Sequence, residues 1–261
     1  MLRSFSGEQG NKNASWDQSV TDILRLGVLV LLWLAGNGWS QEVSTPVRLP
    51  AQEDFHLYLL FGQSNMAGRG KLVDEHDQPH PRVLEFTSEN TWAPATEPLH
   101  FDVPKICGAG IGASFAEEMA KADTSVTIGL VPCAYSGASL EDWRTGGVRF
   151  EAVLVRAKAA SKSGVIKGIL WHQGETDGGE EALATSYLER LELAITEWRE
   201  ALGAPRVPVV AGKLCESLPT VGRDGKTPRY RTIINEQIDA LVDLGRAKQL
   251  TTEIAPLAAG R

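Results

Sequence analysis

Residues 57–70 read LYLLFGQSNMAGRG, and this stretch says more about the fold than any other part of the chain. A short, apolar, β-prone run that ends in Gly-x-Ser with further glycines is typical of a strand that stops at a tight turn. Such a turn holds the Ser64 hydroxyl clear of the sheet, beside free backbone N–H groups. Ser64 is therefore a candidate nucleophile, and the N–H groups are candidate donors to an oxyanion. The alternative is a Gly-rich turn whose serine only caps the next helix.

Two further strand-like runs end in polar residues. Residues 166–171 (IKGILW) lead into HQGETD at 172–177, and residues 126–134 (VTIGLVPCA) lead into YSGAS at 135–139. In chains that alternate strands and helices, ligands bind at the carboxyl ends of the strands. We therefore expect the three strand ends to converge on one crevice.

The rest of the chain alternates in the same way. Strands are predicted near 56–61, 126–131, 166–171 and 207–211. Helices are predicted up to about residue 121, near 150–161, along an amphipathic stripe at 183–202, and near 230–242. Residues 70–110 contain five prolines and are predicted to be rich in loops. This order favours an α/β fold with a mostly parallel sheet that is covered on both faces.

Four motifs in this order resemble a known family. They are GQSNMAG at 62–68, CGAGIG at 107–112, the segment 129–143 and WHQGETD at 171–177. Over roughly residues 54–240 the chain resembles the sialate O-acetylesterase-type carbohydrate esterases of the SGNH hydrolase superfamily. The resemblance implies a three-layer α/β/α sandwich with a flavodoxin-like sheet. It also implies a serine hydrolase that removes acetyl groups from acetylated sugars or polysaccharides, as acetylxylan esterases do.

The resemblance assigns roles to individual residues. Ser64 is the expected nucleophile, and the oxyanion hole is expected to consist of the backbone N–H groups of Ser64 and Gly137 with the side-chain amide of Gln173. Glu175 is the expected carboxylate of the catalytic machinery. Two alternatives stay open: Gln173 bonds only the neighbouring loop, and Glu175 is a structural acid that bonds backbone N–H groups.

Other residues near these motifs are expected to contact substrate or to brace the site. Arg69 is expected to contact sugar hydroxyls and His172 to form part of the pocket wall, while Asn65 braces the turn. The remaining histidines are expected at the surface or in loops: His56, His76, His80 and His100.

The expected general base has no counterpart in this sequence. In the family that this chain resembles, the base belongs to an Asp-x-x-His element close to the C-terminus. In this sequence His172 is the last histidine among the 261 residues. We therefore expect the final strand, the base loop and the last helix to be missing, through a truncation or a frameshift, with residues 246–261 forming an aberrant tail. A different class of function follows as the alternative: a non-catalytic carbohydrate-binding remnant.

The N-terminal region is typical of a targeting segment. Residues 26–35 form a nearly unbroken apolar run preceded by Arg3, Lys12 and Arg25. With cleavage before Gln41, residues 1–40 are a predicted signal peptide, 41–53 a linker and 54–245 the esterase domain of an exported protein. An uncleaved anchor and a buried helix are the alternatives.

Composition narrows the partners. The length of 261 residues suits one domain. The chain is acidic overall, with 26 Lys and Arg against 33 Asp and Glu, and its basic residues form no stripe. We therefore expect no nucleic-acid partner. The five histidines are scattered, with no Cys or carboxylate at the spacing of metal ligands, so no metal site is expected. No cofactor is expected either. A disulfide between Cys107 and Cys133 is compatible with export, but no spacing requires it. The sequence fixes neither the acetylated sugar nor the oligomeric state.

Overall fold

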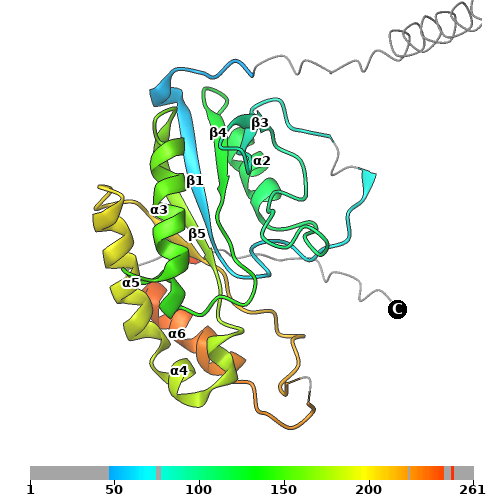
Figure 1. The fold of residues 1–261 in the computed structure, drawn as a ribbon, viewed down its shortest axis with the longest axis vertical. Helices are drawn as coiled ribbons and strands as arrows, with labels where there is room; N and C mark the ends of the chain where they lie inside the picture. The colour runs from blue at the N-terminus through cyan, green and yellow to red at the C-terminus, as the bar shows by residue number, and fades with distance from the viewer. Residues whose placement is uncertain (1–46, 75–77, 223, 244–247, 250–261) are drawn as a thin grey trace, which may run out of the picture. The chain divides into compact units, whose positions relative to one another are not determined.

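A computed structural model describes residues 47–74, 78–222, 224–243 and 248–249. Within them one seven-stranded sheet runs in the order β3-β2-β4-β1-β5-β6-β7 (Figure 1). The predicted signal peptide and most of the predicted tail lie outside these residues. The strands are β1 (Phe55–Gly62), β2 (Val83–Phe86), β3 (Trp92–Pro94), β4 (Thr127–Pro132), β5 (Val165–His172), β6 (Val209–Ala211) and β7 (Lys248–Gln249). The α-helices are α2 (Gly112–Ala122), α3 (Val148–Ala160), α4 (Glu181–Thr185), α5 (Tyr187–Ala201) and α6 (Arg231–Asp243).

The sheet is parallel except at its edge hairpin, where β2 and β3 pair antiparallel. The strands β4-β1-β5-β6-β7 follow the flavodoxin-like order 2-1-3-4-5. The predicted α/β class with a mostly parallel, flavodoxin-like sheet is therefore confirmed. In such a sheet the order reverses between the strands that correspond to β1 and β5, and ligands bind beside that point.

Alternation along β1 builds a core on each face of the sheet. Leu57, Leu59 and Phe61 belong to the core that includes side chains of α3, α5 and α6, while Tyr58 and Leu60 belong to the core beneath α2. Figure 1 shows α3 and α5 on one side of the strands and α2 on the other. The three-layer arrangement is thus the consequence of a central strand that is apolar on both faces.

Three elements differ from the sequence-based predictions. The loop-rich region 70–110 contains the hairpin of β2 and β3. The helical stripe at 183–202 is two helices, α4 and α5, and at the break between them the Arg190 Nη2 donates to the carbonyl oxygen of Leu183 at 2.7 Å. The sheet also has a short strand after α6, because β7 pairs parallel with β6. That the C-terminal element of the family is missing stays a prediction.

The cysteines form no disulfide. Cys107, Cys133 and Cys215 are all free thiols, so the Cys107–Cys133 bridge does not form in this structure. Burial raises the pKa of the Cys133 thiol to about 12. None of the helices in the described ranges has the length and apolar character needed to cross a membrane.

Candidate active site

The turn that carries Ser64 is anchored against the end of β5. The N–H of Gln63 donates to the carbonyl oxygen of His172 at 3.0 Å. Gly62 has φ +141°, and a Cβ built on it would lie 2.1 Å from that same oxygen, so only glycine fits where the two strands end together. Ser64 is half-buried, and its hydroxyl has no hydrogen-bond partner among the described residues. The turn therefore presents an unengaged hydroxyl at the carboxyl edge of the sheet.

Backbone pairing with a second loop fixes the far end of this turn. The N–H of Gly70 donates to Ala109 O at 2.9 Å, and the N–H of Ala109 donates to Gly70 O at 3.0 Å. Gly68 has φ +87°, and a Cβ on it would lie 2.1 Å from the carbonyl oxygen of Gly108. Gly68 and Gly108 therefore allow the close approach of these two loops.

Gly137 lies in the turn after β4, the strand beside β1. The N–H of Tyr135 donates to Gly62 O at 3.1 Å, which ties this turn to the Ser64 turn. Gly137 is exposed with φ +73°, and a Cβ on it would meet nothing within 4 Å. Within the described residues, the backbone N–H groups of Ser64 and Gly137 donate to no acceptor. Two free backbone donors thus lie on neighbouring turns, as an oxyanion hole requires.

Glu175 contacts Asn65, the residue next to Ser64. The side-chain amide of Asn65 donates to Glu175 Oε1, and the N–H of Thr176 donates to Gln63 Oε1 at 3.3 Å. The other carboxylate oxygen, Glu175 Oε2, is buried and has no hydrogen-bond partner in the described part of the chain. Asn65 therefore braces the turn, and Glu175 keeps one oxygen for a further donor.

Gln173 is held differently from the prediction. Its side chain is fully buried, and its amide Nε2 donates to Ala138 O at 3.1 Å and to Asp177 Oδ2 at 2.5 Å. The amide oxygen lies 2.9 Å from the Tyr187 hydroxyl, which can donate to it. Because both amide hydrogens are engaged inside the protein, the structure does not support Gln173 as an oxyanion donor. It favours the alternative, a residue that bonds the neighbouring loop.

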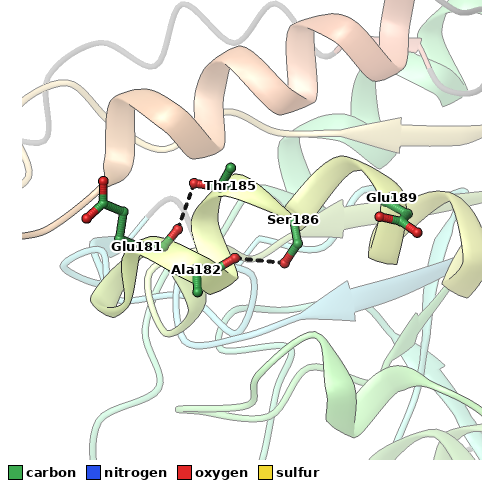
Figure 2. A pocket seen from close by; sticks show the side chains of 5 residues that line it. All are labelled: Glu181, Ala182, Thr185, Ser186 and Glu189. Carbon is green, nitrogen blue, oxygen red and sulfur yellow. Dashed lines mark hydrogen bonds between the residues drawn. The ribbon is translucent and has the colours of Figure 1, made fainter.

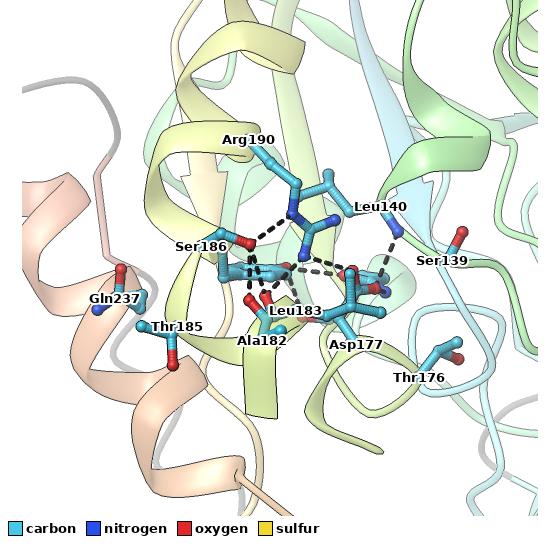
Figure 3. Close-up of polar contacts among 12 residues, drawn as sticks. Ser139, Leu140, Thr176, Asp177, Ala182, Leu183, Thr185, Ser186, Arg190 and Gln237 are labelled. Atoms are coloured by element: carbon cyan, nitrogen blue, oxygen red, sulfur yellow. Dashed lines mark hydrogen bonds and ion pairs between the residues drawn. The ribbon is translucent and has the colours of Figure 1, made fainter. Parts of the chain in front are cut away.

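Asp177 lies at the centre of this buried polar cluster (Figure 3). Its Oδ2 also accepts from the N–H of Leu140 at 2.9 Å, and its Oδ1 pairs with Arg190 Nη2 at 2.7 Å. The Asp177 side chain is fully buried and that of Arg190 is mostly buried. Asp177 is the last residue of the HQGETD motif, but the sequence analysis predicts no role for Asp177 or for Arg190. The sequence feature that could have indicated a role for Asp177 is an acidic residue five positions after the end of a buried strand.

The histidines do not supply a base at this edge. His172 is buried, its Nε2 lies 3.2 Å from the carbonyl oxygen of Lys213, and its ring packs against Gly212. The structure therefore does not support His172 as a substrate-binding residue. His100 is also buried, against expectation, and burial lowers its pKa to about 4. Among the described residues no histidine hydrogen-bonds Ser64 or Glu175, and His76 lies outside them.

Arg69, the other residue expected to contact substrate, follows the Ser64 turn and is half-buried. Its Nη1 donates to Gly68 O at 2.5 Å, and its Nη2 donates to the hydroxyl of Ser136. Two protein acceptors thus hold a guanidinium that has five N–H donors, which leaves donors for substrate.

No cluster of three or more His, Cys, Asp or Glu side chains in the described ranges is suited to hold a metal ion. An open pocket of about 640 Å³ lies on α4 and the start of α5 (Figure 2). It is lined by Glu181, Ala182, Thr185, Ser186 and Glu189. Thr185 and Ser186 donate their hydroxyls to carbonyl oxygens one turn earlier, at 2.9 and 2.8 Å. The pocket contains none of the candidate site residues.

Comparison with known proteins identifies relatives of the whole domain. Residues 54–254 match the family described as carbohydrate esterase, sialic acid-specific acetylesterase. The probable carbohydrate esterase At4g34215 of Arabidopsis thaliana is 34% identical over 188 residues, which are 65% of this chain and 70% of that protein.

Solved structures agree with this match. The crystal structure of the Arabidopsis protein aligns with a TM-score of 0.64 at 29% identity, over 77% of this chain and 84% of that one. NanS aligns with a TM-score of 0.56 at 18% identity, over 77% of this chain and 78% of its own. XAC1771, a carbohydrate acetylesterase of Xanthomonas citri, aligns with a TM-score of 0.51 at 18% identity, over 75% of this chain and 49% of its own. The last two show likeness of fold alone.

Proposed function

The chain belongs to the sialic acid-specific acetylesterase family of carbohydrate esterases, and from that premise we propose that it hydrolyses acetyl esters on sugars with Ser64 as nucleophile. The observation that carries the proposal is the pairing of a free Ser64 hydroxyl with the unengaged N–H groups of Ser64 and Gly137. These groups lie at the point where the strand order reverses, which is where open α/β sheets bind ligands.

The chemistry runs in two steps. Ser64 Oγ attacks the carbonyl carbon of the acetyl group, and the resulting oxyanion accepts hydrogen bonds from the N–H groups of Ser64 and Gly137. The tetrahedral intermediate collapses to acetyl-Ser64 and expels the sugar alkoxide, which takes up the serine proton. Water then attacks the carbonyl carbon of acetyl-Ser64, and the resulting oxyanion is held by the same two N–H groups. The bond to Ser64 Oγ breaks, Oγ takes up a proton from the water, and the acetic acid that leaves ionises to acetate. Glu175 supports this site through Asn65 and keeps its Oε2 for the group that moves the proton. The remaining Arg69 donors are assigned to sugar hydroxyls.

A second candidate function has its own supporting observation. Within the described residues no histidine bonds Ser64 or Glu175, and no histidine follows His172 in the sequence. A domain that keeps the sugar crevice without a base is a non-catalytic carbohydrate-binding remnant. Acetate release separates the two functions.

The test is acetate release from a panel of acetylated xylan, acetylated sialic acid and an aryl acetate. We expect turnover that Ser64→Ala reduces to background, because the covalent step disappears. Ser163→Ala, which changes a half-buried serine just before β5 at the opposite edge of the sheet, is the matched control and should keep the wild-type rate. A loss of less than about tenfold in Ser64→Ala would place the chemistry elsewhere. Sugar binding without Ser64-dependent acetate release would favour the second function.

Export is part of this proposal. It rests on the apolar run at residues 26–35 behind Arg3, Lys12 and Arg25. Sequencing the N-terminus of the protein recovered outside the producing cells tests the proposed cleavage before Gln41.

A further inference from the structure

The turn that carries Gly137 is held from the outer side by Asp102, a residue of the loop between β3 and α2. The N–H of Ser136 donates to Asp102 Oδ2 at 2.6 Å, and the Cys107 thiol donates to Asp102 Oδ1 at 3.2 Å. Both carboxylate oxygens are therefore engaged, and one of them is bonded to the residue directly before Gly137.

Arg69 reaches the same serine from the nucleophile turn. Its Nη2 donates to Ser136 Oγ, while its Nη1 donates to Gly68 O. The Asp102 loop is in turn paired with the nucleophile turn through Gly70 and Ala109. The turn with Ser64, the loop with Asp102 and the turn with Gly137 thus form a closed ring of contacts.

Gly137 needs such support because little else fixes its outer side. It is exposed, has φ +73° and has no neighbour where a Cβ would point. Among the described residues, its own carbonyl accepts a hydrogen bond from Thr176 Oγ1 alone, at 3.3 Å. The Gly137 N–H lies in the peptide plane that follows the Ser136 Cα. The bonds of the Ser136 N–H to Asp102 and of the Ser136 hydroxyl to Arg69 restrain the backbone on the other side of that Cα, and so limit the directions that the Gly137 N–H can take.

The bond from Ser136 to Asp102 is suited to this task because its acceptor is charged. Burial of the Asp102 carboxyl raises its pKa, but hydrogen bonds from Ser136, Cys107 and Val103 together outweigh burial and hold the pKa below its usual value. Hydrogen bonds to an ionised acceptor are shorter and stronger than neutral ones.

We propose that Asp102 is a positioning residue of the esterase site, which orients the Gly137 N–H toward the oxyanion by holding Ser136, with Arg69 completing the same network. This inference rests on the proposed function. It assigns to Arg69 a second role, in which it acts through the turn as well as on sugar hydroxyls.

The experiment compares Asp102→Ala and Asp102→Asn with Asp123→Ala in the full chain. Asp123 is a matched control, because its Oδ1 accepts the N–H of Ser125 at 2.9 Å and the Ser125 hydroxyl at 2.6 Å, before β4 at the opposite edge of the sheet. Two quantities are measured: the exchange rates of the Ser136 and Gly137 amide hydrogens by NMR, and kcat and KM on an aryl acetate. The amide rates do not depend on catalytic competence.

We expect the Ser136 amide of Asp102→Ala to exchange at least about tenfold faster than in wild type. We expect kcat to fall by about 10- to 100-fold with KM nearly unchanged, because the displaced donor acts on the transition state. Asp102→Asn, which keeps a neutral acceptor, should lie between, and Asp123→Ala should match wild type in both readouts.

Unchanged amide exchange in Asp102→Ala overturns the inference, as does faster exchange with unchanged kcat. A rise in KM alone also overturns it, because it assigns Asp102 to substrate binding. If wild type shows no Ser64-dependent turnover, the proposed function fails, and the amide exchange alone decides whether Asp102 holds the turn.

Discussion

Asp177 is fully buried, and its two oxygens bind groups from three parts of the site: Leu140 behind the Gly137 turn, Gln173 at the end of β5, and Arg190 on α5. Gln173 in turn donates to Ala138 O, next to Gly137. Buried bonds therefore hold Ala138 and Leu140, which follow Gly137 in the same turn. Asp177 Oδ1 is held by its ion pair with Arg190 and by no hydrogen bond in the described residues. The members of such a buried polar cluster depend on one another.

Asp177→Asn should lower the free energy of unfolding by about 3 kcal/mol or more, because the new NH₂ group faces donors of Arg190 and Gln173 and leaves a mostly buried guanidinium without its charge partner. Urea denaturation measures this loss. Glu197→Gln is the matched control, since the Arg144–Glu197 pair is more exposed, with side chains 23% and 24% accessible, and should cost at most about 1 kcal/mol. Equal losses in the two variants would contradict the prediction.

The sequence predicted which residues meet at this edge better than it predicted where each side chain points. Strand alternation predicts that the adjacent side chains of His172 and Gln173 point to opposite faces, and the two side chains bond different segments, at Lys213 and Ala138. Alternation does not say which face leads to solvent, however. Both side chains turned out to be buried, because α5 supplies Tyr187 above one of them and the segment after β6 covers the other.

At the scale of elements, length and apolar content decide what a sequence reveals. β1, β4 and β5 lie within about two residues of their predicted ranges, because each is a continuous apolar run in a buried parallel sheet. β2 and β3 are short edge strands in a region full of prolines, so local signals favoured loops. The break between α4 and α5, where the Arg190 side chain bonds the Leu183 carbonyl oxygen, is not visible in the amphipathic pattern at 183–202.

The edge hairpin contains an acid with an unusual titration. Burial raises the pKa of Glu85 on β2 to about 7, with a further rise from nearby Glu97 that outweighs the attraction of Arg156. Between the usual carboxyl range and about pH 7 the folded protein keeps a proton that the unfolded chain releases. The free energy of unfolding therefore falls as pH rises through this window, and the full penalty persists above it.

Glu85→Gln should remove this penalty. The variant should be more stable than wild type by about 1–2 kcal/mol near pH 8, after allowance for the solvent screening of a partly exposed group, and no more stable near pH 4. Chemical denaturation at the two pH values measures the difference. Glu89→Gln, on the exposed turn of the same hairpin, should bring no such gain. A gain of equal size at both pH values would assign the effect to packing.

At the scale of the whole molecule, the sheet brings the Ser64, Gly137 and Glu175 turns to the point where its strand order reverses. Carboxylates on opposite sides then hold the Gly137 turn, Asp102 at Ser136 and Asp177 at Leu140. This architecture holds the proposed nucleophile and the proposed oxyanion donors in place. A group that could take the proton from Ser64 is not among the hydrogen-bond partners of Ser64 or Glu175 in the described residues.

The 261-residue chain should accordingly be a weak esterase that free imidazole activates. Removing a base while keeping the oxyanion hole leaves catalysis of about 10³–10⁴ over water in triad deletions, and we expect a rate in that range on aryl acetates. Added imidazole should raise the rate further, by acting as a diffusible base at the half-buried Ser64 hydroxyl, which has no hydrogen-bond partner among the described residues. Ser64→Ala in the same imidazole buffer gives the background to subtract, since imidazole also attacks aryl acetates directly. His172→Gln should leave both rates unchanged, because the His172 ring is packed against Gly212 and Lys213. A fast rate without imidazole that His172→Gln abolishes would show instead that His172 is the base.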